Sequence, residues 1–389
     1  MVNPPVGVEV APVAASVLDP ASPLSVPFRD AVSRQISRYL EREQRVLDAM
    51  GPELDTLQQL AESLLRGGKR LRPAFAVWSY VAAHGLPDDE LEALLSAAGS
   101  LEMLHVSALV HDDVMDSSDL RRGQPAAHRQ FESLHSGSSW LGDAAAFGRA
   151  GAILLGDLLL MWSVQMLQRC GLPDTTLARA LPILEAMRTE VTCGQYLDVV
   201  AQAQPWQPAT DGAGGSTGIE RALDEASRVV EYKSARDTVQ RPCQMGAALG
   251  GGDARLHDAL GSYGSPLGRA FQYRDDVLGV FGDSEVTGKP SGDDLREGKR
   301  TVLVAHAYAH TDDAGRQLMV RHLGDPALDA AGVAALQEVI TDSGARDSVE
   351  AMIEESYETA MRALEKADLT DEGRRGLTGL AEAAVRRAF

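Results

Sequence analysis

Three aspartates at the end of a long apolar run are the residues of this sequence best suited to chemistry. Asp112, Asp113 and Asp116 follow residues 101–110, a segment without glycine or proline that predicts a buried helix. Residues four apart share a helix face, so Asp112 and Asp116 should project side by side, with Asp113 next to them. Neighbouring carboxylates in apolar surroundings repel each other and are costly to desolvate, so a divalent cation would stabilise them. Mg²⁺ fits best, since it takes carboxylate oxygens, water and substrate phosphates as ligands, whereas a solvated acidic helix end is the alternative interpretation.

A second acidic cluster far downstream favours the metal site. Asp275 and Asp276 close another predicted helical segment. Between the two clusters, a predicted helix over 175–200 carries Gln195 and Asp198, three residues apart on one face. That spacing suits side chains that hydrogen-bond metal-bound water.

Basic residues are spaced around these clusters. In Gly68-Lys69-Arg70-Leu71-Arg72 the glycine lets the backbone approach a ligand, and three cations within four residues should face one place. Lysine acts as a point charge and arginine as a bidentate fork towards phosphate oxygens, while a surface basic turn is the alternative. Further cations that could serve the same purpose are Arg121, Arg122, Lys233, Lys289 and Lys299.

Composition narrows the class of protein. The chain has 389 residues, a formal net charge of −19 and only 5% aromatic residues, with few stretches of β-branched alternation. The charge argues against nucleic acid or an anionic membrane as a partner, but not against a small anion bound by local cations and metal. Three scattered cysteines without metal-type spacing suit a reducing cytoplasm.

The helical pattern predicts an all-α protein with one large domain over 27–389. Residues 1–26 lack lysine and arginine and hold five prolines, which predicts a disordered or loosely packed tail rather than a secretory signal. The Pro-, Gly- and Ser-rich stretch 203–218 predicts a loop insertion within the domain. The apolar run 150–167 contains Asp157, which favours a buried helix over a transmembrane span.

These motifs, in this order and spacing, resemble the trans-isoprenyl diphosphate synthase family, most closely its bacterial geranylgeranyl diphosphate synthases. The resemblance is dense over about 30–310. It implies an antiparallel helical bundle around a deep central cavity, usually in a homodimer. It also implies condensation of isopentenyl diphosphate with an allylic diphosphate (dimethylallyl, geranyl or farnesyl). The motifs that carry it are Gly68-Lys69-Arg70-Leu71-Arg72-Pro73, His111-Asp112-Asp113-Val114-Met115-Asp116, Arg121-Arg122-Gly123, Gly194-Gln195, Lys233-Ser234, Phe271-Gln272, Asp275-Asp276, Gly288-Lys289 and Gly298-Lys299.

The resemblance also implies roles for individual residues. Asp112 and Asp116 would bind two Mg²⁺ ions (or Mn²⁺) on the allylic diphosphate, and Asp275 a third, with Asp276 in support. Gln272 would lie beside the allylic chain. The same diphosphate would be held by Arg121, Lys233, Lys289 and Lys299. A separate, metal-free site for isopentenyl diphosphate would comprise Gly68, Lys69, Arg72, His105 and Arg122; from the residues alone, His105 could equally be a core histidine.

Three departures from the family pattern stand out. Gly279 replaces the third aspartate of the commonest second cluster, Ser234 stands where threonine is usual, and Asp237 where an aromatic residue is common. Two other functions stay open. A terpene cyclase shares the ionisation chemistry, but Gly279 lacks the hydroxyl that the cyclases' second metal motif needs. A non-catalytic partner subunit would be expected to have lost its metal carboxylates.

Product length should depend on the residues one and two turns before Asp112. In the family, bulky residues four or five positions before the first aspartate stop the chain early. Here these positions are the small Ala108 and Ser107, while Leu104 and Met103 could form the floor one turn deeper. This pattern predicts a C20 product, with C25 as the alternative because methionine is adaptable.

Overall fold

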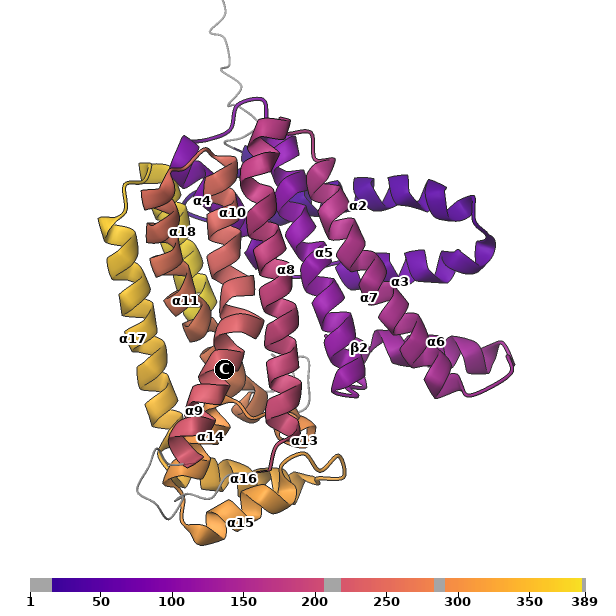
Figure 1. Cartoon of the computed structure of the whole chain (residues 1–389), viewed down its shortest axis with the longest axis vertical. Coiled ribbons are helices and arrows are strands. Elements are labelled where there is room, and N and C mark those ends of the chain that lie inside the picture. Colours follow the sequence, from indigo (N-terminus) through magenta and orange to yellow (C-terminus); the bar gives the residue numbers. More distant parts are fainter. Residues whose placement is uncertain (1–15, 206–217, 283–290, 387–389) are drawn as a thin grey trace, which may run out of the picture.

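The computed structural model describes residues 16–205, 218–282 and 291–386, and within these ranges the chain is almost entirely helical (Figure 1). The described strands form a two-residue antiparallel hairpin, β1 (Leu120–Arg121) with β2 (Gln124–Pro125). The expected all-α fold is thus confirmed. Long helices of alternating direction form the central bundle: α4 (Leu71–His84), α5 (Leu91–Met115), α8 (Asp174–Ala203), the continuous rod of α9 (Gly218–Val229), η2 (Val230–Gln240) and α10 (Arg241–Leu249), α11 (Ala254–Phe281), α17 (Ala345–Lys366) and α18 (Asp371–Val385).

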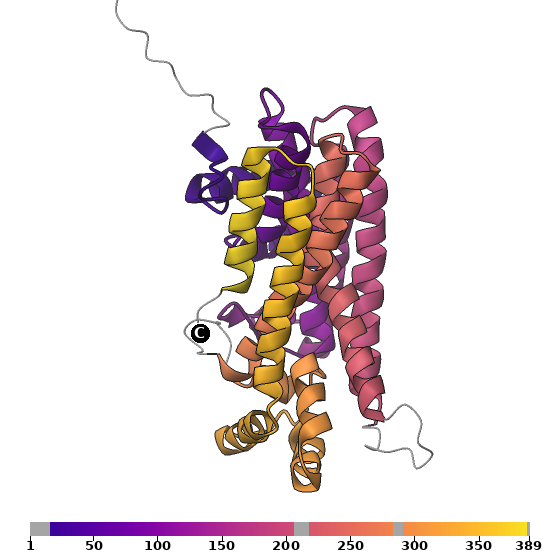
Figure 2. The ribbon, with the colours of Figure 1, turned by 90° about the vertical axis from the view of Figure 1, so that its left-hand side faces the viewer.

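Other helices cover one side and one end of the bundle. The helices on the side are α2 (Val26–Asp48), η1 (Pro52–Leu54), α3 (Asp55–Leu65), α6 (Ala127–Gly137) and α7 (Ala144–Gln168). At the end lie α13 (Asp293–Glu297), α14 (Val302–His310), α15 (Asp313–His322) and α16 (Ala330–Asp342), as Figure 2 also shows.

The helix that carries the first acidic cluster is buried along most of its length. Within α5, residues such as Leu101, Met103 and Leu104 are at most 1% exposed. A helix that is apolar all round belongs in the interior, which explains the uninterrupted apolar run. The second acidic cluster lies in the last two turns of α11, which ends at Phe281 with Gly282 as its C-cap. Both clusters therefore lie near the ends of core helices, as expected.

η2 is a π-helix, a wider turn that often marks functional sites. Two glycines allow neighbouring helices to pack against it at backbone distance. A Cβ atom on Gly194 of α8 would overlap the backbone at Lys233, and one on Gly268 of α11 would overlap that of Ala235. η2 is thus wedged between α8 and α11, which fixes the position of Lys233.

The segment before α2 is packed rather than loose. Leu18 is 2% exposed, and the Trp78 Nε1 donates a hydrogen bond to the Pro23 carbonyl oxygen (3.3 Å). The expectation of a loose tail is therefore wrong from residue 17 onwards; residues 1–15 lie outside the described ranges. The predicted insertion is shorter than 203–218, because α8 continues to Ala203 and α9 begins at Gly218, and residues 206–217 are not described.

The last helix of the chain covers α4. The Thr370 Oγ1 donates to the carbonyl oxygen of Val81 (2.7 Å) at the start of α18. Gly373 and Gly376 then bring the α18 backbone against Ala82 and the Trp78 ring, where any Cβ would overlap. α4 is consequently buried between the two ends of the chain.

Two helices, α5 and α7, are long and apolar enough to cross a membrane by length and composition. The apolar window of α5 is 72% buried in the fold, as in the core helix of a soluble protein. That of α7 is only 44% buried, and its exposed side chains include Ile153, Leu154 and Met161. α7 therefore presents an apolar face that the described residues do not cover.

Candidate active site

A cavity of about 1340 Å³ lies inside the bundle. Its walls come from α5, α8, η2 and α11, together with the loop before α4 and the residues around α13. Most of the predicted site residues line it: Gly68, Lys69, Arg72, Leu104, His105, Ser107, Ala108, Asp112, Arg121, Arg122, Gln195, Asp198, Lys233, Ser234, Gln272, Asp275, Asp276 and Lys299. Asp113 and Asp116 contact the lining residues Arg121 and Lys299. Lys289 lies outside the described residues.

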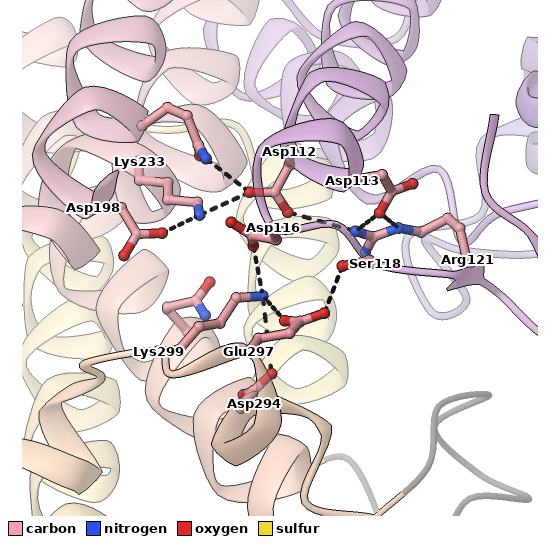
Figure 3. A network of polar contacts seen from close by, with 12 residues as sticks. Asp112, Asp113, Asp116, Ser118, Arg121, Asp198, Lys233, Asp294, Glu297 and Lys299 are labelled. Atoms are coloured by element: carbon pink, nitrogen blue, oxygen red, sulfur yellow. Dashed lines mark hydrogen bonds and ion pairs between the residues drawn. The ribbon is translucent and has the colours of Figure 1, made fainter. Parts of the chain in front are cut away.

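Asp112 is the centre of a dense polar network (Figure 3). Its Oδ1 accepts hydrogen bonds from Lys233 Nζ (3.0 Å) and Gln195 Nε2 (2.9 Å), and its Oδ2 lies 3.5 Å from Arg121 Nη2. Burial alone would raise the pKa of Asp112, but Lys233, Lys299 and Arg121 hold it well below its usual range. Asp112 is therefore ionised and surrounded by cations before any ligand binds.

Two acidic residues predicted to support the metal site, Asp113 and Asp198, bind cationic side chains. Asp113 accepts from Arg121 Nε (2.9 Å) and also from its Nη2. Asp198 Oδ2 accepts from Lys233 Nζ (2.5 Å). Asp113 and Asp198 thus orient Arg121 and Lys233, a role more specific than the predicted contact with metal-bound water.

Asp116 has a buried carboxylate oxygen that could bind a metal ion. Its buried Oδ2 receives no hydrogen bond from the described residues, although Lys299 Nζ lies 3.4 Å away. Burial, followed by repulsion from Asp112, raises the pKa of Asp116 to about 6. A buried carboxylate oxygen without a partner is costly, and a hard divalent cation is the ligand that it suits.

Residues around α13 cover the acidic end of the site. Ser118 Oγ donates to Glu297 Oε1 (2.5 Å), and Lys299 Nζ lies 2.6 Å from Glu297 Oε2 (Figure 3). Burial alone would lower the pKa of Lys299, but the carboxylates around it raise it well above its usual value. Sequence reasoning missed Glu297, because its partner Ser118 is 179 residues away.

The second acidic cluster faces the first from α11. Asp276 Oδ1 accepts from Gln272 Nε2 (2.8 Å), while its buried Oδ2 has no hydrogen-bond partner among the described residues. Burial raises the pKa of Asp276 well above its usual range. A Cβ at Gly279 would overlap the carboxylate of Asp294, so Asp294 occupies the space of the aspartate that this cluster lacks.

The predicted basic group forms a second pocket within the same cavity. One of its three cations, Arg70, is engaged by other parts of the protein. Arg70 Nη1 donates to Glu102 Oε2 (2.8 Å) and its Nη2 to the Leu65 carbonyl oxygen (2.6 Å), with the Arg70 side chain only 2% exposed. Arg70 lines the same cavity as Lys69 and Arg72, but these contacts engage its guanidinium, so Arg70 holds the loop in place. Gly68 has a φ of +86°, and a Cβ there would lie 3.5 Å from Arg122 Nη1.

Arg72 lies in the wall of the same pocket and has partners on η2. Its Nε donates to Asp237 Oδ2 (2.8 Å), and its Nη2 donates to Thr238 Oγ1 (2.8 Å). These contacts account for Asp237, which the sequence left unexplained. Burial, then the charges of Arg72 and Arg122, lower the pKa of His105 well below its ordinary value, so this side chain is neutral at physiological pH.

The residues expected to limit product length divide into two groups. Leu104, Ser107 and Ala108 line the cavity. Met103 is fully buried but is not part of the described lining, so it does not form the expected floor. Ser107 Oγ donates to the Gly156 carbonyl oxygen (2.7 Å), which ties α5 to α7. Other helices also contribute to the cavity wall, α7 through Leu160 and α8 through Val191 and Thr192.

An all-helical bundle with two acidic clusters facing a basic pocket across one cavity defines the isoprenoid synthase fold. The family model of polyprenyl synthetase matches residues 54–340, and the chain belongs to this family. It is therefore a prenyltransferase of the trans-prenyl diphosphate synthase class.

Relatives of different product length resemble the chain. The crystal structure of a geranylgeranyl pyrophosphate synthase from Corynebacterium glutamicum, complexed with isoprenyl diphosphate and magnesium, is 36% identical, with a TM-score of 0.86 over 95% of this chain and 100% of that one. A geranylfarnesyl diphosphate synthase from Aeropyrum pernix is 30% identical over 84% of this chain and 92% of its own length. A (2E,6E)-farnesyl diphosphate synthase from Mycobacterium tuberculosis is 32% identical over 72% and 68%. These relatives belong to one family, but their names give products of different length.

Proposed function

We propose that the chain joins isopentenyl diphosphate to an allylic diphosphate, head to tail (1'-4), with geranylgeranyl diphosphate as the main product. The observation that carries this proposal is the pairing of two unlike anion sites on one cavity. One combines carboxylates with cations around Asp112, and the other is a basic pocket around Arg72 without a carboxylate cluster. Two diphosphates held in this way would bring their hydrocarbon ends together in the apolar part of the cavity.

The acidic end is suited to Mg²⁺, with Mn²⁺ as a substitute. We assign Asp112, Asp116 and Asp275 as ligands for three ions. The choice is supported at Asp116 by a buried oxygen that no described residue hydrogen-bonds, and at Asp112 and Asp275 by their place in the lining of one cavity. When bound, the metal would neutralise charge that develops on a departing diphosphate.

The chain's own residues would hold and shield the allylic substrate. Lys233, Arg121 and Lys299 are already oriented by carboxylates and would bind the allylic diphosphate with little reorganisation, together with Ser234 and Lys289. Closure of α13 through Glu297 would keep water from the reacting carbons.

Neither alternative function is favoured. In a cyclase, a hydroxyl-bearing side chain at position 279 would be needed, but Asp294 fills that space. A non-catalytic subunit should have lost carboxylates, whereas Asp112, Asp116 and Asp275 are all present. The direct test incubates the protein with Mg²⁺, labelled isopentenyl diphosphate and each allylic starter, then sizes the products. A C20 main product supports the proposal, and cyclic hydrocarbons or no elongation would refute it.

Product length should respond to a bulky side chain at Ala108. Ala108 lines the cavity one turn before Asp112, so Ala108→Phe should block the tail and shift the main product from C20 to C15. Leu104→Ala, one turn deeper, should lengthen it. Ser107 is a less suitable position for this test, because Ser107→Phe also removes the hydrogen bond to Gly156. Chromatographic sizing is the measurement, with Met103→Ala as a control that lies off the described cavity wall and should leave product length unchanged.

Metal affinity should depend on pH through Asp116. A carboxylate must be deprotonated to bind metal, so protons compete with Mg²⁺ below the Asp116 pKa of about 6. The half-saturating Mg²⁺ concentration should be flat above that pH and rise about tenfold per unit below it. Titrations between about pH 5 and about pH 8 would measure this. Lys299→Met should move the rise to higher pH, because Lys299 lowers the pKa of Asp116; an identical Mg²⁺ requirement across the range would contradict the assignment.

We further propose a cytoplasmic homodimer in which the exposed face of α7 is covered by a second copy. Ile153, Leu154 and Met161 are 44%, 62% and 54% exposed, an apolar grouping typical of interaction surfaces. The double variant Leu154→Glu/Met161→Glu should sediment as a monomer. The control Val320→Glu changes a similarly exposed residue on α15 and should leave the dimer intact. A wild-type monomer in solution would refute the proposal.

A further inference from the structure

Asp237 lies in an unusual place for a carboxylate, next to a pocket proposed to bind a diphosphate. It lies on the π-helix η2, and its side chain is 3% exposed. Two cations lie near it on the same element, Lys233 one turn earlier and Arg236 directly before it. A buried negative charge near an anion site opposes binding unless it performs another task.

That task is visible in the contacts of Arg72. Asp237 Oδ2 accepts from Nε (2.8 Å) and lies 2.7 Å from Nη2 of the same guanidinium. Nη2 also donates to the neighbouring Thr238 Oγ1 (2.8 Å). Two adjacent residues of η2 thus hydrogen-bond one edge of the guanidinium. Among the described residues none hydrogen-bonds Nη1, which is left to bind a ligand.

Fixing this side chain in advance has an energetic consequence. A free arginine must lose rotamer freedom when it binds a diphosphate, and immobilising one such side chain weakens binding about twofold to tenfold. Arg72 is only 11% exposed and is already held at one edge, so this loss occurs on folding instead of on binding. The π-helical turn contributes because it places Asp237 and Thr238 together against the first turn of α4, which carries Arg72.

We infer that Asp237 is a positioning residue that preorganises Arg72 for isopentenyl diphosphate, which makes it a determinant of affinity for that substrate alone. This inference rests on the proposed function of the Arg72 pocket. The opposite possibility is that Asp237 competes with the substrate for Arg72. The two make opposite predictions, because removing a competitor lowers the KM for isopentenyl diphosphate and removing a positioning residue raises it.

The test compares Asp237→Ala and Asp237→Asn. Asp237→Ala should raise the KM for isopentenyl diphosphate about threefold to tenfold and leave the KM for the allylic diphosphate within about twofold. Asp237→Asn keeps an oxygen that accepts from Nε, so its KM should stay within about twofold of the wild type. Glu190→Ala is the matched control, since Glu190 pairs with Arg236 of η2 and with Arg241 (2.6 and 2.5 Å), neither of which is assigned to the pocket. It should lower thermal stability without a selective change in either KM.

A double-mutant cycle shows whether Asp237 acts through Arg72. If it does, Asp237→Ala should add nothing to the KM of an Arg72→Ala protein. An additive effect, or a lower or unchanged KM for Asp237→Ala, would overturn the inference. If Asp237→Ala does not fold, the same cycle is made with Asp237→Leu, which is close to aspartate in size and has no hydrogen-bond acceptor in its side chain. A normal KM for isopentenyl diphosphate in Arg72→Ala itself would instead count against the proposed function of the pocket.

Discussion

Replacing Asp112 by asparagine should abolish turnover while the chain stays folded. Asp112 contacts Lys233, Gln195 and Arg121 together, and it is ionised in the folded protein. Asparagine keeps the shape of the side chain but removes the charge that metal binding requires. Loss of a preorganised electrostatic contact of this kind reduces the rate on the order of a thousandfold.

Two measurements separate this loss from misfolding. Circular dichroism should show the wild-type helical signal, since the amide can still pair with Gln195. Mg²⁺ with a non-reactive diphosphate should raise the melting temperature of the wild type but not of Asp112→Asn, because ligands stabilise only a state that binds them. As a control, Asp157→Asn changes a half-exposed aspartate on α7 and should retain both activity and Mg²⁺ stabilisation. Wild-type turnover by folded Asp112→Asn would exclude its metal role.

Replacing Arg72 by alanine should affect the two substrates very differently. In the proposed assignment the basic pocket binds its diphosphate without a metal, so the loss of one charge-assisted arginine contact should raise the KM for isopentenyl diphosphate roughly tenfold to a hundredfold. The allylic diphosphate is held by other cations, and its KM should stay within about twofold. Initial rates with each substrate varied in turn provide the measurement, and equal effects on both substrates would contradict two separate sites.

The neighbouring Arg70 provides a sharp contrast. Arg70→Ala leaves Glu102 buried without its partner, so it should lower the free energy of unfolding by about 3–5 kcal/mol. Thermal or urea unfolding measures this cost. Two arginines two positions apart are therefore expected to fail in different ways, one in binding and one in stability.

The local parts of the site could be predicted from the sequence, because helix geometry links residues three or four apart. Asp112 with Asp116, and Gln195 with Asp198, are such pairs. The helical class followed equally directly from the apolar runs, such as the one that became α5.

The rest depends on contacts between distant segments, which spacing does not contain. Residue type and spacing do not distinguish Arg70 from Arg72, yet one pairs with Glu102 and the other with Asp237, 165 residues away. Asp294 fills the space beside Gly279 only because α13 folds back onto α11. Met103 shares a helix with Leu104 but faces packed side chains instead of the cavity, since a rotation of one residue changes the helix face.

The packing of α18 on α4 has a consequence for how the chain folds during synthesis. α4 is complete once residue 84 has been made, but its Trp78 and Ala82 remain uncovered until Gly373 and Gly376 arrive nearly three hundred residues later. At about 5–20 residues per second, a ribosome would expose this apolar surface for tens of seconds. The bundle therefore cannot close before residues 373–376 have been made, and truncations before residue 370 should yield chains that depend on chaperones or aggregate.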